Sequence, residues 1–567
     1  MMMMMIYMFL MINMVVSSSH IPSSAATEIV AHLKHSNREL LEEVFWNIAD
    51  PTSKNYAKFE SIESVRDMIG ASEEEIELVK DWLVSIGGDR LSLKVSNLAD
   101  TVSVTFSEKS PPSWNELKKG PSCVEFVLKR SAKISSSDSK PTTTLSDSLS
   151  EYTVSNIKKA YGIPTDLTAK NDSLLQMVWG PGTFGYSKFQ LEMFKTSQVP
   201  LLNISRVQFD TKNHGESGGD NFGEGMLDTK MVSAFGLNVH TLVSNTNTSA
   251  STEEGNGFGQ ALLDFLTSLA SREELPHVLS LSLGSLSASS CDILCNQAVE
   301  KKDISRSDCE SFLQQQRQVC MFLSDSQASK IDTALQVLGS RGVTIFGSSG
   351  DGGSHFSFGP FQGDSKVANA LNEISCEFQL PVFPTASPYV VSVGGEMWKD
   401  DDSSKPITWQ GFGGGSGGGF SWSFPMPSYQ KDAVQKYLDS ESSSLPPASS
   451  FNSSGRAYPD ISAVGVDGTS QSSPLMAGIF SLVIDARLNK GLGRLGFLGP
   501  RIWQVATSYP GEAFEDISEG NSGLSCDNGF ASASNSWDPN TGFGRPIWSG
   551  LLKHFASDDH ISIFTKK

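Results

Sequence analysis

A serine at the entrance to a long apolar segment is the residue best placed to act as a nucleophile. Ser470 stands in the string GTSQSSP (468–474), and an apolar run over 475–482 follows it. This pattern predicts a loop that opens into a helix, where a hydroxyl can face a cleft and helix-terminal N–H groups can face an anion. Such a serine needs a base, and the sequence has no His-Gly-Thr-His string to supply one. The activating group must therefore be sought among other side chains.

Two carboxylates four residues apart, Glu224 and Asp228, are the candidates for that base. They open a helix-like stretch that continues through Ala234, so they lie on one face of a helix. Pairs with this spacing are common on solvated faces, and that interpretation stays open. If the pair is buried beside Ser470, the two carboxyl groups share a proton and one pKa rises. The pair can then take a proton from serine at an acidic pH, where imidazole is already protonated.

Asp351 lies in the glycine-rich turn 347–353, which follows an apolar, strand-like run. Aspartate is common in turns because it tolerates left-handed backbone angles, so an ordinary turn residue is one interpretation. The other is a buried, protonated carboxyl group that donates a hydrogen bond to a developing oxyanion. That role again requires low pH.

Two C-terminal segments contain oxygen ligands for a hard cation. Asp516 and Ile517 lie in one segment, and Ser534, Ser536 and Asp538 lie in the other. Carboxylates combined with backbone carbonyls suit calcium, so we expect one structural Ca²⁺ ion here. Neither segment is specific by itself.

Apolar strand-like runs alternate with helical patterns beyond residue 150. Runs at 278–283, 343–346 and 389–393 predict strands, and the patterns at 260–271 and 328–339 predict helices. This alternation predicts an α/β domain with a mainly parallel sheet, whose site lies at the carboxyl ends of the strands.

The glycine-rich segment 411–419 has the composition of a flexible linker. Structured patterns flank it, so we interpret it instead as a backbone-lined substrate groove.

The N-terminal part predicts a separate, compact α+β unit. Residues 74–86 have an amphipathic helical pattern, and 91–106 contains alternating, strand-like runs. Residues 131–150 are rich in Ser, Thr and Lys, which predicts an exposed, protease-sensitive linker. A compact unit, a cleavable linker and a larger part together indicate a zymogen. Two ordinary domains on a flexible tether remain the alternative.

Composition and the N-terminus indicate the environment of the protein. The net charge is −19 and no basic stripe occurs, which argues against a nucleic-acid partner. Residues 1–16 are almost wholly apolar and three serines follow, which predicts a secretory signal at 1–19. The apolar stretch is short for a stable membrane span. Four Asn-x-Ser/Thr triplets, at Asn171, Asn203, Asn247 and Asn452, are candidate glycosylation sites in a secreted chain.

The seven cysteines are distributed unevenly along the chain. Four of them, Cys291, Cys295, Cys309 and Cys320, cluster in one segment. Their spacing fits no common zinc pattern, and in a secretory context two local disulfides are expected, with the connectivity open. A third pair, Cys376 with Cys526, would leave Cys123 unpaired.

These motifs, taken in order, resemble the sedolisins, the serine-carboxyl peptidases, and within them the tripeptidyl-peptidase I group. The Gly-Thr-Ser-x-Ser string at 468–472, the Glu-x-x-x-Asp pair at 224–228 and the Ser-Gly-Asp turn at 349–351 match family motifs. The strings FPTASPYV (383–390), GGGFS (417–421), RAYPD (456–460) and LPHV (275–278) resemble flanking signatures. The resemblance runs from about Glu28 to the C-terminal region.

The resemblance implies a fold and a role for each candidate residue. It implies a subtilisin-like α/β catalytic domain with a mainly parallel sheet at 151–567, preceded by a ferredoxin-like α+β propeptide at 20–130 and a cleavable linker at 131–150. Ser470 would be the nucleophile, Glu224 the base, Asp228 its supporting acid and Asp351 the oxyanion residue. Calcium would be bound by Asp516, Asp538 and the carbonyls of Ile517, Ser534 and Ser536.

The implied activity is hydrolysis of peptides and unfolded proteins at acidic pH through an acyl-enzyme, with release of tripeptides from free N-termini. The propeptide would inhibit its own enzyme, and the compartment would be lysosome-like or an acidic exterior. A sedolisin-type endopeptidase is one alternative. A catalytically impaired homologue that binds peptides is the other.

The chain departs from the family pattern in three places. Only 464–467 separate Ala463 from the Gly-Thr-Ser motif, where the family commonly has a longer, hairpin-like segment. Ser534 and Ser536 replace the usual glycines at the calcium-site carbonyls. The cysteine-bearing stretch 289–324 resembles an insertion near the cleft.

Overall fold

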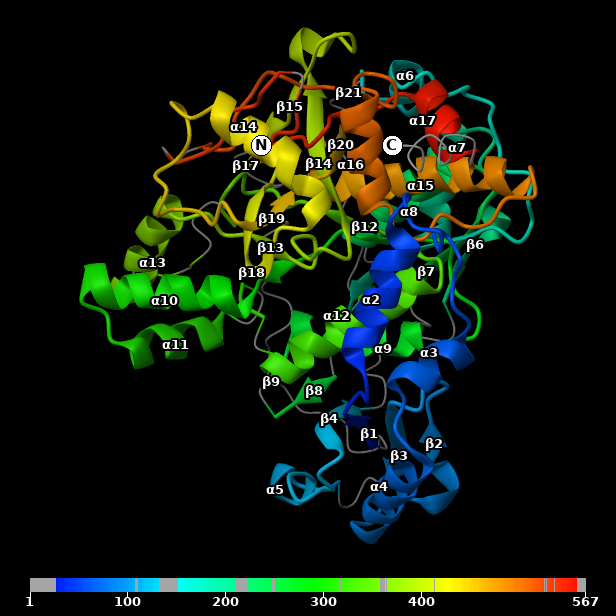
Figure 1. Cartoon of the computed structure of the whole chain (residues 1–567), viewed down its shortest axis with the longest axis vertical. Helices are drawn as coiled ribbons and strands as arrows, with labels where there is room; N and C mark the ends of the chain where they lie inside the picture. The colour runs from blue at the N-terminus through cyan, green and yellow to red at the C-terminus, as the bar shows by residue number, and fades with distance from the viewer. Residues whose placement is uncertain are drawn as a thin grey trace.

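Figure 1 shows the computed structural model of the chain, in which an N-terminal unit and a larger main domain lie against each other. The structure describes residues 27–557, apart from 108–110, 132–150, 183, 211–222, 247–249, 254, 317–318, 322, 357–360, 362, 364, 412–413, 525, 527 and 535. Residues 27–131 form the N-terminal unit, and residues 151–557 form the main domain. The predicted signal segment 1–19 and nearly all of the predicted linker 131–150 fall outside the described residues.

The N-terminal unit is a ferredoxin-like α+β fold. Its strands pair antiparallel in the order β2-β3-β1-β4, and helices occupy both crossover connections. The helix predicted at 74–86 is α4, which begins where Ser72 and Glu75 form a capping box. The elements of this unit are β1 (Thr27–Leu33), α2 (Arg38–Ala49), α3 (Ile62–Ile69), α4 (Glu73–Ser85), β2 (Lys94–Val95), β3 (Thr101–Phe106), α5 (Trp114–Leu117) and β4 (Val124–Ser131).

The main domain is built on a mainly parallel sheet. Its strands pair in the order β15-β14-β12-β10-β5-β7-β6, with β20 beside β14, and the pairing of β14 with β15 is antiparallel. The strands β10 and β12 are buried along their whole length, which explains why they form continuous apolar runs. The strands are β5 (Leu175–Pro181), β6 (Val207–Phe209), β7 (His240–Thr246), β10 (Val278–Leu281), β12 (Thr344–Ser348), β14 (Val391–Trp398), β15 (Pro406–Thr408) and β20 (Ile461–Val464).

Helices cover this sheet and match the predicted alternation. The patterns at 260–271 and 328–339 are α9 and α12, and the stretch that begins at Glu224 is α8. Of the helices in the described part of the chain, none has the length and apolar character needed to cross a membrane. The helices are α6 (Val154–Ala160), α7 (Lys188–Ser197), α8 (Glu224–Phe235), α9 (Phe258–Ala270), α12 (Asp325–Ser340), α14 (Lys431–Ser440), α15 (Thr469–Leu488), α16 (Gly499–Ser508) and α17 (Trp548–Phe555).

The helices α8 and α15 approach each other closely enough to require glycine. A Cβ added at Gly478 of α15 would lie 2.7 Å from the backbone nitrogen of Gly236 and 2.8 Å from the carbonyl oxygen of Val232. The first turns of the same two helices also meet, because Ser470 hydrogen-bonds to Glu224. The helices therefore run in the same direction, and their N-termini lie together.

A disulfide-bonded segment stands apart from the sheet. The helices α10 (Ala288–Lys302), α11 (Arg306–Gln315) and α13 (Lys366–Glu377) share a small hydrophobic core of their own, at the left of Figure 1. The disulfides are Cys291–Cys320, Cys295–Cys309 and Cys376–Cys526, and Cys123 is free and buried. The prediction of two local disulfides and a third, distant one is confirmed, and the open connectivity is resolved.

Short strands complete the main domain. They are β8 (Ser251–Thr252), β9 (Gly255–Asn256), β11 (Ser285–Leu286), β13 (Val382–Phe383), β16 (Gln410–Gly411), β17 (Gly414–Gly415), β18 (Gly419–Pro425), β19 (Gly455–Tyr458), β21 (Phe514–Glu515) and β22 (Arg545–Pro546).

The N-terminal unit shares a hydrophobic core with the main domain. The ring of Phe45 in α2 packs edge-on against Tyr389, with the ring centroids 5.2 Å apart. A Cβ at Gly339 of α12 would lie 2.6 Å from the Phe45 ring, so α2 and α12 are in close contact. Strand β4 also pairs with β8 at Lys129 and Ser251, which continues the N-terminal sheet onto the main domain. The two parts are therefore joined by apolar packing and by backbone pairing.

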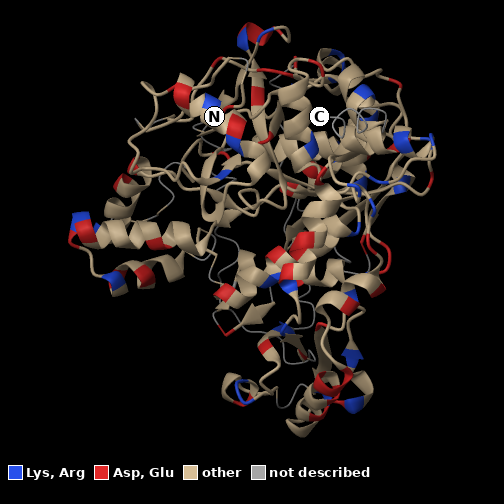
Figure 2. Ribbon diagram, viewed as in Figure 1, with Lys and Arg blue, Asp and Glu red and all other residues tan. Residues whose placement is uncertain are grey.

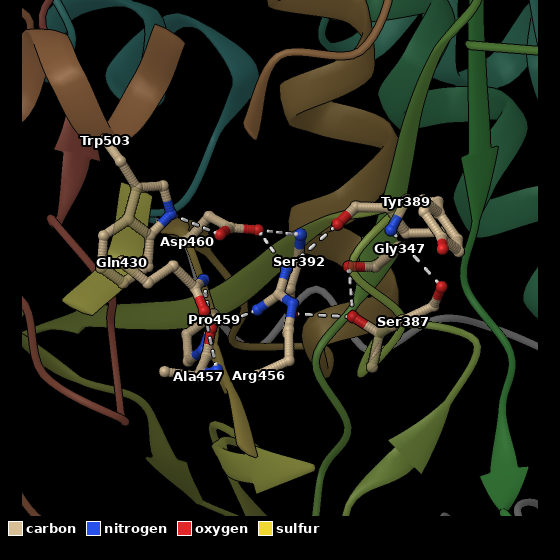
Figure 3. Close-up of polar contacts among 12 residues, drawn as sticks. Gly347, Ser387, Tyr389, Ser392, Gln430, Arg456, Ala457, Pro459, Asp460 and Trp503 are labelled. Carbon is tan, nitrogen blue, oxygen red and sulfur yellow. Dashed lines mark hydrogen bonds and ion pairs between the residues drawn. The ribbon is translucent and has the colours of Figure 1, made fainter. Parts of the chain in front are cut away.

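A buried ion pair joins the strands that lead to the apolar helix α15. The Asp460 carboxylate accepts hydrogen bonds from Arg456 Nη2, from the backbone N–H of Ser392 and from Trp503 Nε1, each at 2.7 Å (Figure 3). The side chains of Arg456 and Asp460 are at most 1% exposed. Removing one member of such a pair leaves an uncompensated charge in the interior.

We expect Asp460→Ala to lower the free energy of unfolding by about 3–5 kcal/mol, because Arg456 would stay buried without its carboxylate. Urea unfolding followed by tryptophan fluorescence measures this loss. Asp81→Ala is the control, since it breaks an ion pair with Arg90 in which both side chains are 70% exposed. Equal effects of the two substitutions would show that the buried network does not stabilise the fold.

Candidate active site

Ser470 lies in the first turn of α15, at the predicted loop-to-helix junction. Gly468 precedes the helix with a φ of 98°, a backbone angle at which a residue with a side chain is strained. A Cβ at Gly468 would also lie 2.9 Å from Asp351 Oδ2. This glycine is therefore required both for its backbone angle and for the close approach of Asp351.

The short connection before the Gly-Thr-Ser motif is well packed in this structure. Strand β20 retains parallel pairing with β14. The Ser472 hydroxyl lies 3.1 Å from the carbonyl oxygen of Ala463 and 3.2 Å from that of Val464. A Cβ at Gly465 would lie 2.6 Å from Ser472 Oγ. The turn therefore passes from the strand to α15 with its backbone close to the helix.

The Ser470 hydroxyl lies between two acceptors. One is the carboxyl group of Glu224, to which the Ser470 hydroxyl donates a hydrogen bond. The other is the carbonyl oxygen of Ser282, 3.2 Å from Ser470 Oγ. The structure thus brings together Glu224 at the start of α8 and Ser470 at the start of α15, as the sequence predicted.

The pKa values of the Glu224 and Asp228 carboxyl groups are both raised above their ordinary range. Burial raises the pKa of Glu224 to about 7, the Ser470 hydrogen bond opposes this, and the charge of Asp351 adds to it. Burial, followed by the charge of Glu224, holds the pKa of Asp228 well above its usual range. Two close carboxyl groups in a buried place share protons, so the pair retains at least one proton in acid.

One oxygen of each carboxyl group lacks a hydrogen-bond donor. Among the described residues, Glu224 Oε1 and Asp228 Oδ2 are buried and have no hydrogen-bond partner. The other oxygen of Asp228, Oδ1, accepts a hydrogen bond from the Ser282 hydroxyl at 2.9 Å. A carboxyl proton carried by the pair is the group available to satisfy the two remaining oxygens.

Asp351 follows β12 and faces the first turn of α15. Its Oδ1 accepts hydrogen bonds from the backbone N–H and the hydroxyl of Thr469, each at 2.8 Å. Burial raises the pKa of Asp351, although these two hydrogen bonds from Thr469 oppose the shift. With Oδ1 occupied, Oδ2 is the oxygen that can carry a proton.

The glycine-rich segment 411–419 forms part of the wall behind Asp351. The backbone N–H of Gly415 donates to the Asp351 carbonyl oxygen at 2.8 Å, and that of Gly417 donates to the Gly350 carbonyl oxygen at 2.7 Å. A Cβ at Gly417 would lie 2.4 Å from the carbonyl oxygen of Ser349. The described part of this segment is therefore packed structure and not a tether between domains.

Two residues of the site were missed by the sequence analysis. Ser282, directly after β10, contacts both Asp228 and Ser470. Thr469 holds Asp351, and its hydroxyl also accepts from the backbone N–H of Gly350 at 3.1 Å. The position of Ser282 at the carboxyl end of a predicted strand was the one available signal.

The predicted insertion 289–324 lies beside this site. It begins shortly after Ser282, and β11 at its base pairs with β13. Ser289, in the first turn of α10, makes a short hydrogen bond with Ser423 of β18. Within the insertion, the Cys295–Cys309 disulfide joins α10 to α11, and the Cys291–Cys320 disulfide joins α10 to the segment after α11.

The two acidic members of the predicted calcium set lie near each other. Burial raises the pKa of Asp538 to about 8, and the charge of Asp516 contributes to the increase. The Thr541 hydroxyl lies 3.3 Å from Asp538 Oδ1 and 3.4 Å from the Ile517 carbonyl oxygen, which links both segments. A divalent cation would relieve the repulsion between the buried carboxylate of Asp538 and the half-buried one of Asp516, so these residues fit calcium. Ser534 and Ser536 flank Asp538 on the same loop.

Known proteins resemble this chain in sequence and in structure. Pseudomonas sedolisin, a serine-carboxyl proteinase, has a similar structure with a TM-score of 0.49 and 20% identity, covering 71% of this chain and 96% of that chain. A family model described as the Pro-kumamolisin activation domain matches residues 14–109. Tripeptidyl-peptidase 1 of Macaca fascicularis is 27% identical, and that of Homo sapiens is 28% identical, each covering 92% of this chain and 90% of the relative.

The chain is similar to the sedolisins, both in its N-terminal unit and over most of its length. It is a serine-type peptidase of the serine-carboxyl class, synthesised as a zymogen whose N-terminal unit is the activation domain. The resemblance drawn from its motifs is confirmed.

Ser282 belongs to none of the motifs, and its substitution tests whether its contact with Asp228 matters for activity. We expect Ser282→Ala to lower kcat about 10- to 100-fold with little change in KM, because Asp228 loses the hydrogen bond that Ser282 donates to it. Ser282→Thr keeps the hydroxyl and should restore most of the activity. Because the Ser282 bond opposes the raised pKa of Asp228, its loss should also move the acidic limb of the pH profile to higher pH.

The matched control is Ser280→Ala, which removes a buried hydroxyl from the same strand. Ser280 Oγ bonds to Ser473 Oγ at 2.9 Å, away from the carboxyl pair. If Ser280→Ala and Ser282→Ala have the same kinetics and pH profiles, Ser282 serves packing alone.

Proposed function

We propose that this sedolisin hydrolyses peptide bonds through an acyl-enzyme at acidic pH, with Ser470, Glu224, Asp228 and Asp351 as its catalytic residues. The observation that carries the proposal is the Ser470 hydroxyl, which hydrogen-bonds to a buried carboxyl group of raised pKa. Asp351 lies against the turn immediately before Ser470. This arrangement supplies a nucleophile, a base and an oxyanion donor in one place.

The first half of the reaction forms the acyl-enzyme. Ser470 Oγ attacks the substrate carbonyl carbon while its proton passes to Glu224, and Asp228 stabilises the pair with the remaining shared proton. The substrate oxygen gains negative charge and accepts a hydrogen bond from the protonated Oδ2 of Asp351. Glu224 then returns its proton to the amine as the C–N bond breaks.

The second half releases the acyl group. A water molecule gives a proton to Glu224 and attacks the ester carbon, while Asp351 again donates to the oxyanion. The C–O bond to Ser470 breaks, and Glu224 returns the proton to Ser470 Oγ. A catalytically impaired peptide-binding homologue is the less favoured alternative, because all four residues are present, Ser470 bonds to Glu224, and Asp351 bonds to the neighbouring Thr469.

The ionisation of Asp351 should set the alkaline limit of activity. Its raised pKa keeps the carboxyl donor protonated above the ordinary value of 3.8, and the donor is lost as the pH rises through the raised pKa. Asp351→Asn replaces it by an amide that donates at every pH. We therefore expect a reduced kcat/KM whose alkaline limb moves to higher pH, measured on a fluorogenic peptide from pH 3 to 8, roughly the span over which carboxyl groups titrate.

Two further variants serve as controls for this pH profile. Ser470→Ala should abolish turnover, and Asp351→Ala should lose more activity than Asp351→Asn, because alanine offers no hydrogen-bond donor to the oxyanion. An Asp351→Asn profile with an unchanged alkaline limb would contradict the oxyanion role. A wild-type chain that cleaves no peptide at any acidic pH would refute the peptidase mechanism altogether.

Tripeptide release is the finer part of the proposal. It is supported by the names of the relatives, which are tripeptidyl-peptidases aligned over 92% of this chain. A sedolisin-type endopeptidase remains the competing possibility. The two differ in whether the enzyme requires a free α-amine close to the scissile bond.

Mass spectrometry of the products from a long peptide with a free N-terminus distinguishes these activities. We expect successive tripeptides from that end, because an exopeptidase must bind the free N-terminal ammonium group of the peptide before each cleavage. The same peptide with an acetylated N-terminus is the control and should resist cleavage. Internal fragments from both peptides would identify an endopeptidase.

Calcium is proposed as a structural ion held by the C-terminal loops. Asp516, Asp538 and the carbonyls of Ile517, Ser534 and Ser536 would bind it. When bound, it would neutralise the two carboxylates and fix the loop after β21 against the loop before β22. Among the described residues, no cluster of three or more His, Cys, Asp or Glu side chains forms an alternative metal site.

We also propose the processing and location of the chain. The signal would end near residue 19, the propeptide near 130, and the peptidase domain would begin at 151 after cleavage within 131–150. Three disulfides support folding in the secretory pathway. The exposed side chain of Asn203 is accessible to glycosylation, whereas Asn247 lies outside the described residues. A protonated Asp351 favours an acidic destination, either a lysosome-like organelle or an acidic exterior.

A further inference from the structure

A buried tyrosine near the start of the main domain contacts the turn that precedes Ser470. The Tyr161 hydroxyl accepts a hydrogen bond from the backbone N–H of Val464 at 2.8 Å and donates one to Glu396 Oε1 at 2.6 Å. Tyr161 and Glu396 are 1% and 0% exposed. Tyr161 is the C-cap of α6, Glu396 lies in β14, and Val464 is the last residue of β20. One hydroxyl group therefore joins three segments that are far apart in the sequence.

Glu396 is an unusual residue for its place in the main-domain sheet. In the eight strands of that sheet, as the structure describes them, it is the one Lys, Arg, Asp or Glu residue. Figure 2 shows such residues mainly on the helices and loops around the sheet. A carboxyl group is costly to bury unless it is hydrogen-bonded, so the bond from Tyr161 is what makes this position tolerable.

The carboxyl group of Glu396 can hold Tyr161 in either protonation state. Its Oε1 accepts the tyrosine hydroxyl, whereas Oε2 lies 3.7 Å from Arg545 Nη1. Burial raises the pKa of Glu396 to about 7, and the charge of Arg545 and the bond from Tyr161 oppose this shift. In acid, Oε1 stays an acceptor when Oε2 carries the proton. The bond to Tyr161 is therefore kept over the acidic range.

The backbone of Glu396 also holds the turn before Ser470. The backbone N–H of Gly465 donates to the Glu396 carbonyl oxygen at 3.0 Å, and that of Gly468 donates to the Gly465 carbonyl oxygen at 3.0 Å. Only residues 465–469 separate Val464 from Ser470. A displacement of Val464 would therefore be passed through this short, hydrogen-bonded turn to the Ser470 hydroxyl.

We propose that Tyr161 and Glu396 are positioning residues for the nucleophile. Their hydrogen bond holds the end of β20, and through the turn 465–469 it fixes the Ser470 hydroxyl against Glu224. Both residues act through the turn and not on the substrate. The inference rests on the proposed role of Ser470 as nucleophile, and it adds two residues that lie outside every motif of the sequence.

A second tyrosine of the same segment offers a matched comparison. The ring of Tyr152 stacks on Trp398 with the centroids 4.5 Å apart, and its hydroxyl accepts from the Trp398 backbone N–H at 2.7 Å. Trp398 lies two residues after Glu396 in β14, so both tyrosines contact the same face of one strand. Tyr152 thus holds β14 itself, whereas Tyr161 also holds the turn.

Steady-state kinetics of Tyr161→Phe on a fluorogenic peptide tests the positioning role. This substitution removes the hydroxyl and keeps the ring in the core. We expect kcat to fall about 10- to 100-fold with KM changed less than about twofold, because a displaced Ser470 attacks more slowly while the substrate contacts remain. Tyr152→Phe removes a tyrosine hydroxyl that accepts a similar backbone bond, and its kcat should stay within about twofold of the parent.

Two substitutions at Glu396 separate positioning from acid–base chemistry. Glu396→Gln keeps an oxygen acceptor for Tyr161, so it should retain most of the activity and the pH profile of the parent. Glu396→Met has a similar length but no acceptor, so its kinetics should resemble those of Tyr161→Phe. A displaced limb in the pH profile of Glu396→Gln would show that the ionisation of Glu396 takes part in the reaction, which contradicts a positioning role.

Hydrogen–deuterium exchange of the full-length chain at neutral pH gives a readout that does not depend on activity. Tyr161→Phe should speed exchange in peptides that cover 464–470, because the Val464 N–H loses its acceptor. Tyr152→Phe should instead speed exchange at Trp398. If Tyr161→Phe does not fold, Glu396→Met tests the same bond from its other end.

Two outcomes would overturn the proposal. One is exchange over 464–470 in Tyr161→Phe that equals exchange in the parent, since the bond would then not hold the turn. The other is an equal kcat for Tyr161→Phe and Tyr152→Phe, since the turn would then not position the nucleophile. A wild-type chain that cleaves no peptide would refute the proposed function, while the exchange result would still decide whether Tyr161 holds the turn.

Discussion

The close packing of α8 against α15 is the constraint on which the active site depends. Gly478 lets the two backbones approach until a side chain no longer fits between them. Because the helices run in the same direction, the approach brings Glu224 and Ser470 together at their first turns. The parallel sheet places Ser282 and Asp351 at the carboxyl ends of neighbouring strands, on the same side. The chemistry is thus held by rigid elements, with only short turns between them.

Burial is the common cause behind the unusual ionisation of this protein. It raises the pKa of Glu224, Asp228 and Asp351 and lowers that of His35, so carboxyl groups keep protons and imidazoles lose them. In the proposed active site, this shift would let carboxyl groups act as base and oxyanion donor. Burial is therefore the first cause of the shifts both there and at the contact between the two parts.

The sequence predicted what depends on local pattern and missed what depends on distant contacts. Ser470 and Asp351 could be found because each lies at a recognisable junction between an apolar run and a glycine-rich turn. Ser282 could not, since a serine after a strand has no distinguishing spacing until Asp228 is placed beside it. The contact of His35 with Lys330 joins residues 295 positions apart, and no periodicity encodes it. The disulfide connectivity was open for the same reason.

The shared core beneath α2 has a consequence for the direction of maturation. Phe45 and Trp46 of α2 pack against Tyr389 and Phe497 of the main domain, so departure of the N-terminal unit uncovers aromatic surface. If that surface folds only against the N-terminal unit, a mature enzyme that has lost this covering could not refold. The mature enzyme would then stay folded because it unfolds slowly, and not because the folded state is in equilibrium with the unfolded chain. Activation would be a one-way step, after which a denatured molecule could not be recovered.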